Sequence, residues 1–147
     1  MKKFDNFVSN LEILQKAEQE DLKNEFIISG IIDKFFIQFE LSWKVLKELL
    51  RYEGKSSANS GSPREILKAA YEVYDFIDED VWLDMLKSRN DMTHIYDGDA
   101  AKRFVNDILY RYIPEFIKLR ENIAEQYEEV LSQIWYTFCK KEISEDG

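Results

Sequence analysis

The segment RNDMTHIYDGD, from Arg89 to Asp99, contains the single histidine of the chain, His94. An imidazole exchanges protons near neutral pH, and the guanidinium of Arg89 keeps its positive charge there. Together these two side chains could perform acid–base chemistry beside an anion. The alternative is structural: His94 would end a helix with its ring bonded to a backbone group, and Arg89 would form a surface salt bridge with acidic helix starts.

Metal-dependent and nucleophilic chemistry is poorly supported by the other residues. His94 and the single cysteine, Cys139, lie far apart, so the sequence offers no ligand cluster with zinc spacing. A magnesium site built from carboxylates alone stays open. Neither Cys139 nor any serine stands in a recognisable nucleophile motif, and a triad would have to use the one histidine as its base. We therefore expect a site that contains no metal and no cofactor.

Helix geometry separates the candidate residues into two faces. On a regular helix Arg89 and Tyr96 share a face, whereas His94 shares its face with Asn90, four residues back. Arg89 and His94 would point about 140° apart, because each residue turns the helix by about 100°. Either the helix is distorted near THIYDGD, or a second copy of the chain contributes its own pair across a two-fold axis. On this ground we expect a homodimer with the two RNDMTHIY segments near one another.

Length, composition and charge limit the fold and the partners. A chain of 147 residues with 45% hydrophobic content fits one domain with a sizeable core. Its two prolines and five glycines are few for an all-β sandwich, which needs frequent turns, so long helices are expected. The formal net charge of −9 argues against a protein that coats nucleic acid with a broad basic face. A small local RNA site is compatible with that charge.

The N-terminal segment, the lengths of the apolar runs and the cysteine count predict the compartment of the protein. The start MKKFDNF is basic, but no apolar run of a signal peptide follows it. The longest apolar stretches are too short to cross a bilayer. One cysteine cannot make an internal disulfide, which suits a reducing compartment. We expect a cytoplasmic protein with no membrane partner.

Two apolar stripes at spacings of three and four predict the first two helices. The first stripe consists of Phe4, Phe7, Val8, Leu11, Leu14 and Leu22. The second, in FIISGIIDKFFIQFELSWKVLKELLRYEG, consists of Ile28, Ile31, Ile32, Phe35, Phe36, Phe39, Trp43, Leu46, Leu49 and Leu50. It ends at Gly54, a residue suited to the left-handed conformation after a helix. So broad a stripe predicts a central helix that touches several neighbours.

Capping residues predict where the remaining helices start. In SPRE, Ser62 can cap and Pro63 can take the first helical position of a short helix that runs to about Tyr74. Asp78 can cap another helix that continues through Tyr96. Its bulky side chains, expected in the core rather than around a ligand, are Trp82, Met85 and Leu86.

The last long helix is expected to start at a cap formed by Asp99, and Pro114 should kink or split it. Its apolar positions are Phe104, Ile108, Tyr112, Phe116, Leu119, Ile123, Tyr127, Val130 and Ile134. The predicted fold is all-α: an antiparallel four-helix up-and-down bundle with an additional short helix. We expect a single domain over 1–135 and a polar tail over 136–147.

Three motifs together carry a family resemblance: FELSWKVLKELLRYEG, SPRE and WLDMLKSRNDMTHIY. They resemble the nucleotidyltransferase substrate-binding proteins of the HEPN superfamily, over about Phe4 to Val130. These are small helical partners of minimal nucleotidyltransferases and are toxins of toxin–antitoxin modules. The resemblance implies a HEPN-like bundle and a cognate minimal nucleotidyltransferase as partner.

Individual residues match the motif of that family. Arg89, Asn90 and His94 occupy the R-N-x-x-x-H positions associated with metal-independent RNA cleavage, and Tyr96 occupies the position that the partner modifies with AMP. The resemblance thus implies a ribonuclease toxin that acts on RNA, with tRNA as one candidate, and is neutralised by AMPylation. The alternative is a non-catalytic binding module that presents a substrate or itself to the nucleotidyltransferase, with Arg89 and His94 holding a nucleotide phosphate.

Overall fold

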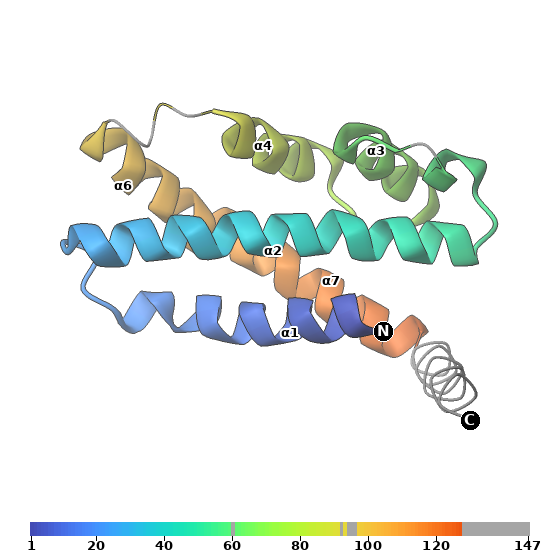
Figure 1. Cartoon of the computed structure of the whole chain (residues 1–147), viewed down its shortest axis with the longest axis horizontal. Coiled ribbons are helices and arrows are strands. Elements are labelled where there is room, and N and C mark those ends of the chain that lie inside the picture. The colour runs from blue at the N-terminus through green and yellow to red at the C-terminus, as the bar shows by residue number, and fades with distance from the viewer. Residues whose placement is uncertain (60, 92, 94–96, 128–147) are drawn as a thin grey trace, which may run out of the picture.

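The computed structural model describes residues 1–59, 61–91, 93 and 97–127, and no strand occurs in these ranges (Figure 1). The α-helices are α1 (Lys2–Gln15), α2 (Glu25–Tyr52), α3 (Pro63–Val73), α4 (Glu79–Asn90), α6 (Gly98–Asp107) and α7 (Ile113–Gln126). Two 3-10 helices, η1 (Lys16–Gln19) and η2 (Ser56–Asn59), and a π-helical turn, η3 (Ile108–Tyr112), lie between them. The prediction of an all-α fold is confirmed. Among the described helices, none is long and apolar enough to cross a membrane.

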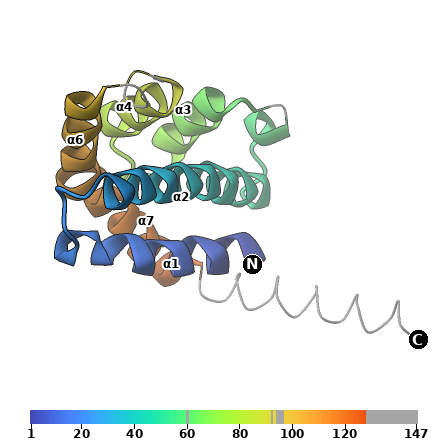
Figure 2. The same cartoon turned by 60° about the vertical axis from the view of Figure 1, so that its left-hand side comes forward.

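Helix α2 lies at the centre of an up-and-down bundle. Figures 1 and 2 show α1 along one side of α2, and α3 with α4 along the other. Helices α1 and α4 run against the direction of α2, and the chain returns through α6 and α7. The predicted antiparallel bundle with additional short helix therefore describes the structure, with α3 as the short helix.

The core is built on the apolar side of α2, as the stripe predicted. Phe35 lies at its centre, with ring centroids 5.1 Å from Phe104, 5.3 Å from Tyr112 and 6.1 Å from Phe116. These separations are typical of favourable aromatic pairs. Phe35 thus joins α2 to α6, η3 and α7. Trp43 differs from the expectation because it is partly buried at the edge of the core.

Local capping chemistry sets several helix boundaries where the sequence placed them. Gly54 follows α2 with a φ of 76°, the left-handed region that glycine enters without strain. The Ser62 hydroxyl accepts a hydrogen bond from the Glu65 N–H, with Pro63 in the first turn of α3. The Asp78 carboxylate accepts from the Val81 N–H at the start of α4. Each cap satisfies a donor that the helix cannot satisfy itself.

The last helical stretch starts two residues earlier than predicted. Asp97, not Asp99, is the cap: its carboxylate accepts from the backbone N–H groups of Asp99 and Ala100. Asp99 instead lies in the first turn, where its charge is favourable at the positive end of the helix. Pro114 splits the stretch, as expected, because its ring removes a backbone donor and the turn before it widens into η3. Val130, Ile134 and the predicted tail 136–147 lie outside the described residues.

The first helix is also shorter than its apolar stripe. Helix α1 ends at Gln15, and Leu22 lies beyond η1 in the connection to α2, partly buried against the core. The spacing of Leu22 therefore reflects burial of a connecting segment and not a continued helix.

A chain of hydrogen bonds closes the end of the bundle where α7 meets α2. The Tyr127 hydroxyl donates to Glu53 Oε1 over 2.7 Å and lies 2.8 Å from the Tyr74 hydroxyl. Burial raises the pKa of both phenols above the ordinary tyrosine value. Both phenols therefore stay protonated and act as donors in this chain of contacts.

Candidate functional site

Helix α4 presents candidate site residues on two faces, because its buried residues fix its rotation. Trp82 and Met85 are fully buried, and Arg89 follows them by seven and four residues, on the same face. Arg89 therefore points toward α2. Asn90 follows Leu86 by four residues and lies on the neighbouring face. As predicted, Trp82, Met85 and Leu86 belong to the core.

The guanidinium of Arg89 is held by a carboxylate from the middle of α2. Arg89 Nη2 donates to Glu40 Oε1, and the second oxygen of Glu40 accepts from Trp43 Nε1 over 3.0 Å. Both oxygens of Glu40 are thus occupied, which fixes the carboxylate and the direction of the Arg89 side chain. The side chains of Arg89 and Glu40 remain 33% and 31% exposed, so a ligand can still reach the guanidinium. The structural alternative expected a pairing with acidic helix starts, and the partner is instead in the interior of α2.

Helix α4 ends at Asn90, six residues before the predicted end at Tyr96. Asp91 adopts an extended backbone conformation, and its carboxylate accepts hydrogen bonds from the Thr93 N–H and the Thr93 hydroxyl. A side chain that bonds the backbone two residues ahead competes with continuation of a helix. The angle of about 140° between Arg89 and His94 assumed one regular helix, so it does not apply. That geometric reason for a second copy of the chain is removed.

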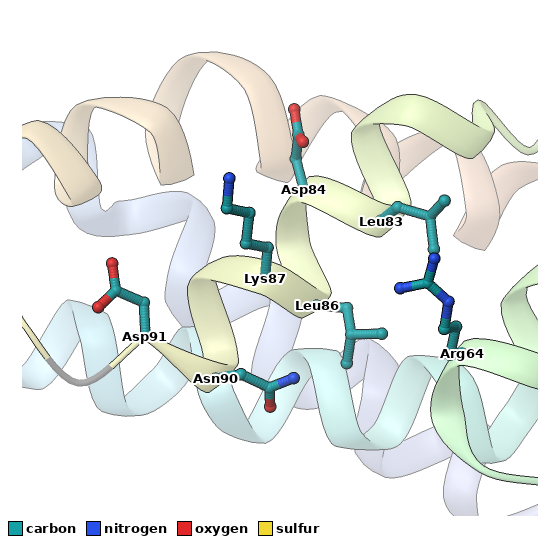
Figure 3. A pocket seen from close by; sticks show the side chains of 7 residues that line it. All are labelled: Arg64, Leu83, Asp84, Leu86, Lys87, Asn90 and Asp91. Carbon is teal, nitrogen blue, oxygen red and sulfur yellow. The ribbon is translucent and has the colours of Figure 1, made fainter.

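A cavity of about 460 Å³ opens beside Asn90, on the α3 side of α4 (Figure 3). It is lined by Arg64, Leu83, Asp84, Leu86, Lys87, Asn90 and Asp91. Arg64 extends from the first turn of α3, while the other six side chains come from α4 and its end. Asn90 therefore belongs to a hollow lined by charged side chains of both signs, and Arg89 does not line it. Of the four predicted site residues, the structure describes Arg89 and Asn90, whereas His94 and Tyr96 lie outside the described residues.

Sequence reasoning missed three residues of this region: Glu40, Arg64 and Lys87. Glu40 is separated from Arg89 by 49 positions, so local spacing could not pair them. Its spacing to Trp43, three residues later on one helix, was a usable local indication of a fixed carboxylate. Arg64 could have been noticed as a cation at a helix start, where acidic residues are favoured.

Ser88, which directly precedes Arg89 on α4, has a structural contact. The Ser88 and Tyr112 hydroxyls lie 3.1 Å apart, and burial raises the pKa of the Tyr112 phenol. The phenol therefore stays protonated and links α4 to η3. Within the described part of the chain, no group of three or more histidine, cysteine, aspartate or glutamate residues is arranged to hold a metal ion.

A comparison with known families finds one family whose match spans the bundle from α1 into α7. The family described as nucleotidyltransferase substrate binding protein like matches residues 2–125, from α1 into α7. The chain belongs to this family. No curated protein matches the sequence. The description of the nucleotidyltransferase substrate binding family associates its members with a nucleotidyltransferase, and the match includes Glu40, Arg64, Arg89 and Asn90.

Proposed function

We propose that this chain is a HEPN-type metal-independent ribonuclease, the toxin of a toxin–antitoxin module whose cognate nucleotidyltransferase neutralises it with AMP. The observation that carries the proposal is the placement of Arg89. Its guanidinium is fixed by Glu40 yet remains partly exposed, in the last turn of α4, five residues before His94 in the sequence. Membership of the nucleotidyltransferase substrate binding family supports the partner.

The proposed reaction needs one proton acceptor, one proton donor and one cation. The 2′-oxygen of a ribose attacks the adjacent phosphorus and the bond from phosphorus to the 5′-oxygen breaks, leaving a 2′,3′-cyclic phosphate and a 5′-hydroxyl. His94 takes the proton of the attacking hydroxyl, and the resulting imidazolium returns this proton to the leaving 5′-oxygen. Arg89 stabilises the negative charge that gathers on the phosphorane oxygens. Metal ions take no part in these steps.

The contact with Glu40 leaves Arg89 able to bind a phosphate. A guanidinium has five N–H donors, and Glu40 accepts from Nη2. The remaining donors can form paired hydrogen bonds to phosphate oxygens. In this proposal Glu40 is a positioning residue, and Asn90, exposed at the next position, donates its side-chain amide to the same strand of RNA.

Neutralisation is proposed to act at Tyr96. An AMP group on its phenol would bring a phosphate to the segment that follows Arg89, where it would occupy the cation and block the path of RNA. The proposal thereby assigns to the partner nucleotidyltransferase the transfer of AMP from ATP to the phenol oxygen, with pyrophosphate as the leaving group.

A cleavage assay tests the proposal. The purified chain is incubated with total RNA and with tRNA in excess EDTA, beside His94→Ala, Arg89→Ala and the control Arg51→Ala, which replaces an exposed arginine at the end of α2. We expect fragments with 2′,3′-cyclic phosphate ends from the wild type and the control, and a loss of about a hundredfold or more from the other two. Intact RNA with all four proteins overturns the ribonuclease proposal.

The family description favours a second candidate function. A substrate-binding partner without activity would hold a nucleotide phosphate through Arg89 and His94 and form a complex with the nucleotidyltransferase. It predicts binding that is lost in Arg89→Ala but no cleavage by the wild type. A homodimer remains a prediction under either function, and light scattering at micromolar concentration tests it.

A further inference from the structure

The cavity between α3 and α4 is lined by two cations, two carboxylates, one amide and two leucine side chains. Arg64 borders it on the α3 side, while Lys87 and Asn90 border it in the last turn of α4 (Figure 3). Leu83 and Leu86 form the apolar part between them. Its volume of about 460 Å³ lies within the range of small-ligand sites. A ligand here would meet two cations, one amide, two leucine side chains and the carboxylates of Asp84 and Asp91.

The acidic residues of the cavity wall are bound elsewhere. Asp84 accepts a hydrogen bond from Arg111 Nη2 over 2.9 Å, on the other side of α4. Asp91 accepts from the Thr93 N–H and hydroxyl. In the described ranges, Arg64 and Lys87 form no ion pair with either aspartate. Two cations therefore remain available in a protein whose formal net charge is −9.

The position of Arg64 conflicts with the local electrostatics of its own helix. It is the second residue of α3, after Pro63, at the helix end that carries a partial positive charge. A cation there lowers the stability of the isolated helix, whereas an anion bound beside it would gain from both the guanidinium and the helix end. Local conflicts of this kind are expected at functional sites. The position of Arg64 in its helix therefore favours an anion site here independently of the shape of the cavity.

We infer that this cavity binds a phosphate group of a ribonucleotide between Arg64 and Lys87, with Asn90 as a further donor and the sugar or base against Leu83 and Leu86. That the ligand is a ribonucleotide rests on the proposed function. The phosphate belongs to the RNA strand next to the bond that is cut, because Asn90 lines the cavity and is adjacent in sequence to Arg89. A free nucleotide would present the same chemistry, so the test includes both sources.

Binding is measured with a 2′-O-methyl oligonucleotide, which carries phosphates but no hydroxyl that can attack them. Fluorescence anisotropy compares the wild type with the double variant Arg64→Gln, Lys87→Gln and with each single variant. The control Lys23→Gln, Lys55→Gln removes the same number of exposed cations away from the cavity. A parallel titration uses AMP and ATP. All replaced side chains are exposed, and thermal unfolding verifies that each variant remains folded.

We expect the dissociation constant of the oligonucleotide to rise about tenfold in the double variant and to stay unchanged in the control. The slope of log affinity against log salt should fall by about 0.7, since the contact with one phosphate of a single strand contributes about 0.7. A loss confined to AMP and ATP assigns the phosphate to a free nucleotide. Equal binding of both ligand types by the wild type and the double variant, or no binding by either, overturns the inference. Cleavage of unmodified RNA is measured separately, so failure of the ribonuclease proposal is distinguished from failure of this site.

Discussion

Arg89 in the last turn of α4 donates through Nη2 to Glu40 in the middle of α2, 49 positions earlier. The same carboxylate accepts from Trp43 on its own helix, so it cannot turn away from the arginine without losing a second hydrogen bond. This relationship ties the direction of a candidate catalytic cation to the central helix of the bundle. It also separates two proposed roles: in the proposed reaction Arg89 contacts the RNA phosphate, and Glu40 acts through Arg89.

Replacement of Glu40 tests that separation. In Glu40→Gln the amide keeps an oxygen acceptor, but the charge that holds Arg89 is lost. We expect kcat for RNA cleavage to fall about tenfold, which corresponds to about 1.4 kcal/mol of transition-state stabilisation. KM should stay constant or fall, because a negative charge near the RNA has been removed. Steady-state kinetics on a defined oligonucleotide separates the two parameters.

The matched control is Glu48→Gln on the same helix. Glu48 pairs with Lys3 of α1 over 2.7 Å. It lies eight residues along α2 from Glu40, the residue that contacts Arg89. It should leave both kinetic parameters unchanged. If Glu40→Gln raises kcat, Glu40 competes with RNA for Arg89 and does not position it, and this assignment is then wrong.

Loss of the two motif side chains should remove activity without unfolding the protein. His94→Ala and Arg89→Ala are expected to abolish toxicity when expressed in a bacterial host. For Arg89→Ala the lost ion pair is about one third exposed, so its contribution is at most about 1 kcal/mol. The thermal midpoint should fall by no more than about 3 °C in a domain of this size. A larger fall on calorimetry, with toxicity retained, would favour the structural alternative.

Three buried tyrosines predict how stability changes at alkaline pH. Burial raises the pKa of Tyr74, Tyr112 and Tyr127 above 10.0 in the fold. Because the unfolded chain releases these protons more readily, the free energy of unfolding is unaffected below about pH 10 and falls above it. Each tyrosine contributes up to about 1.4 kcal/mol per pH unit to the slope. Chemical denaturation between pH 8 and pH 11 measures it.

Tyr127→Phe should reduce that slope by the contribution of one phenol. At pH 8 the same variant loses the hydrogen bonds to Glu53 and Tyr74 and should be less stable by about 1 to 3 kcal/mol. Tyr110→Phe replaces an exposed tyrosine and serves as the control, with unchanged stability at pH 8. An alkaline slope in Tyr127→Phe equal to that of the wild type would contradict the assignment.

Two helix starts and one helix end could be predicted, because the residues that cause them lie within a few positions of the boundary. Ser62 and Asp78 each bond an N–H three residues ahead, and Gly54 takes a conformation that other residues avoid. The same local rule could not choose between Asp97 and Asp99, since either can cap. The structure uses Asp97, which places Gly98 and Asp99 inside the first turn.

The candidate site was harder to predict because it depends on distant contacts and on one local competition. The apolar pattern continued past Asn90, so periodicity extended α4 to Tyr96. The pair of Asp91 with Thr93 ends the helix first, although an aspartate two residues before a threonine was present as a turn signal. Glu40 and Arg64 approach α4 from other helices, and spacing along the chain carries no information about such contacts.

Tyr96 is predicted to be the acceptor of AMP from the partner enzyme. It directly precedes Asp97 in the sequence, and Asp97 is the exposed cap of α6, where another active site can reach the chain. An added phosphate could pair with the free donors of the Arg89 guanidinium and close the site. Tyr96→Phe keeps the ring but removes the acceptor oxygen, so this variant should fold, cut RNA and resist neutralisation.

The control is Tyr110→Phe, which replaces an exposed tyrosine on η3 and should be neutralised like the wild type. Mass spectrometry after incubation with the nucleotidyltransferase and ATP should show the mass of AMP on the peptide that contains Tyr96. If the partner modifies the chain at another tyrosine, or modifies Tyr96→Phe as fully as the wild type, the acceptor has been misassigned.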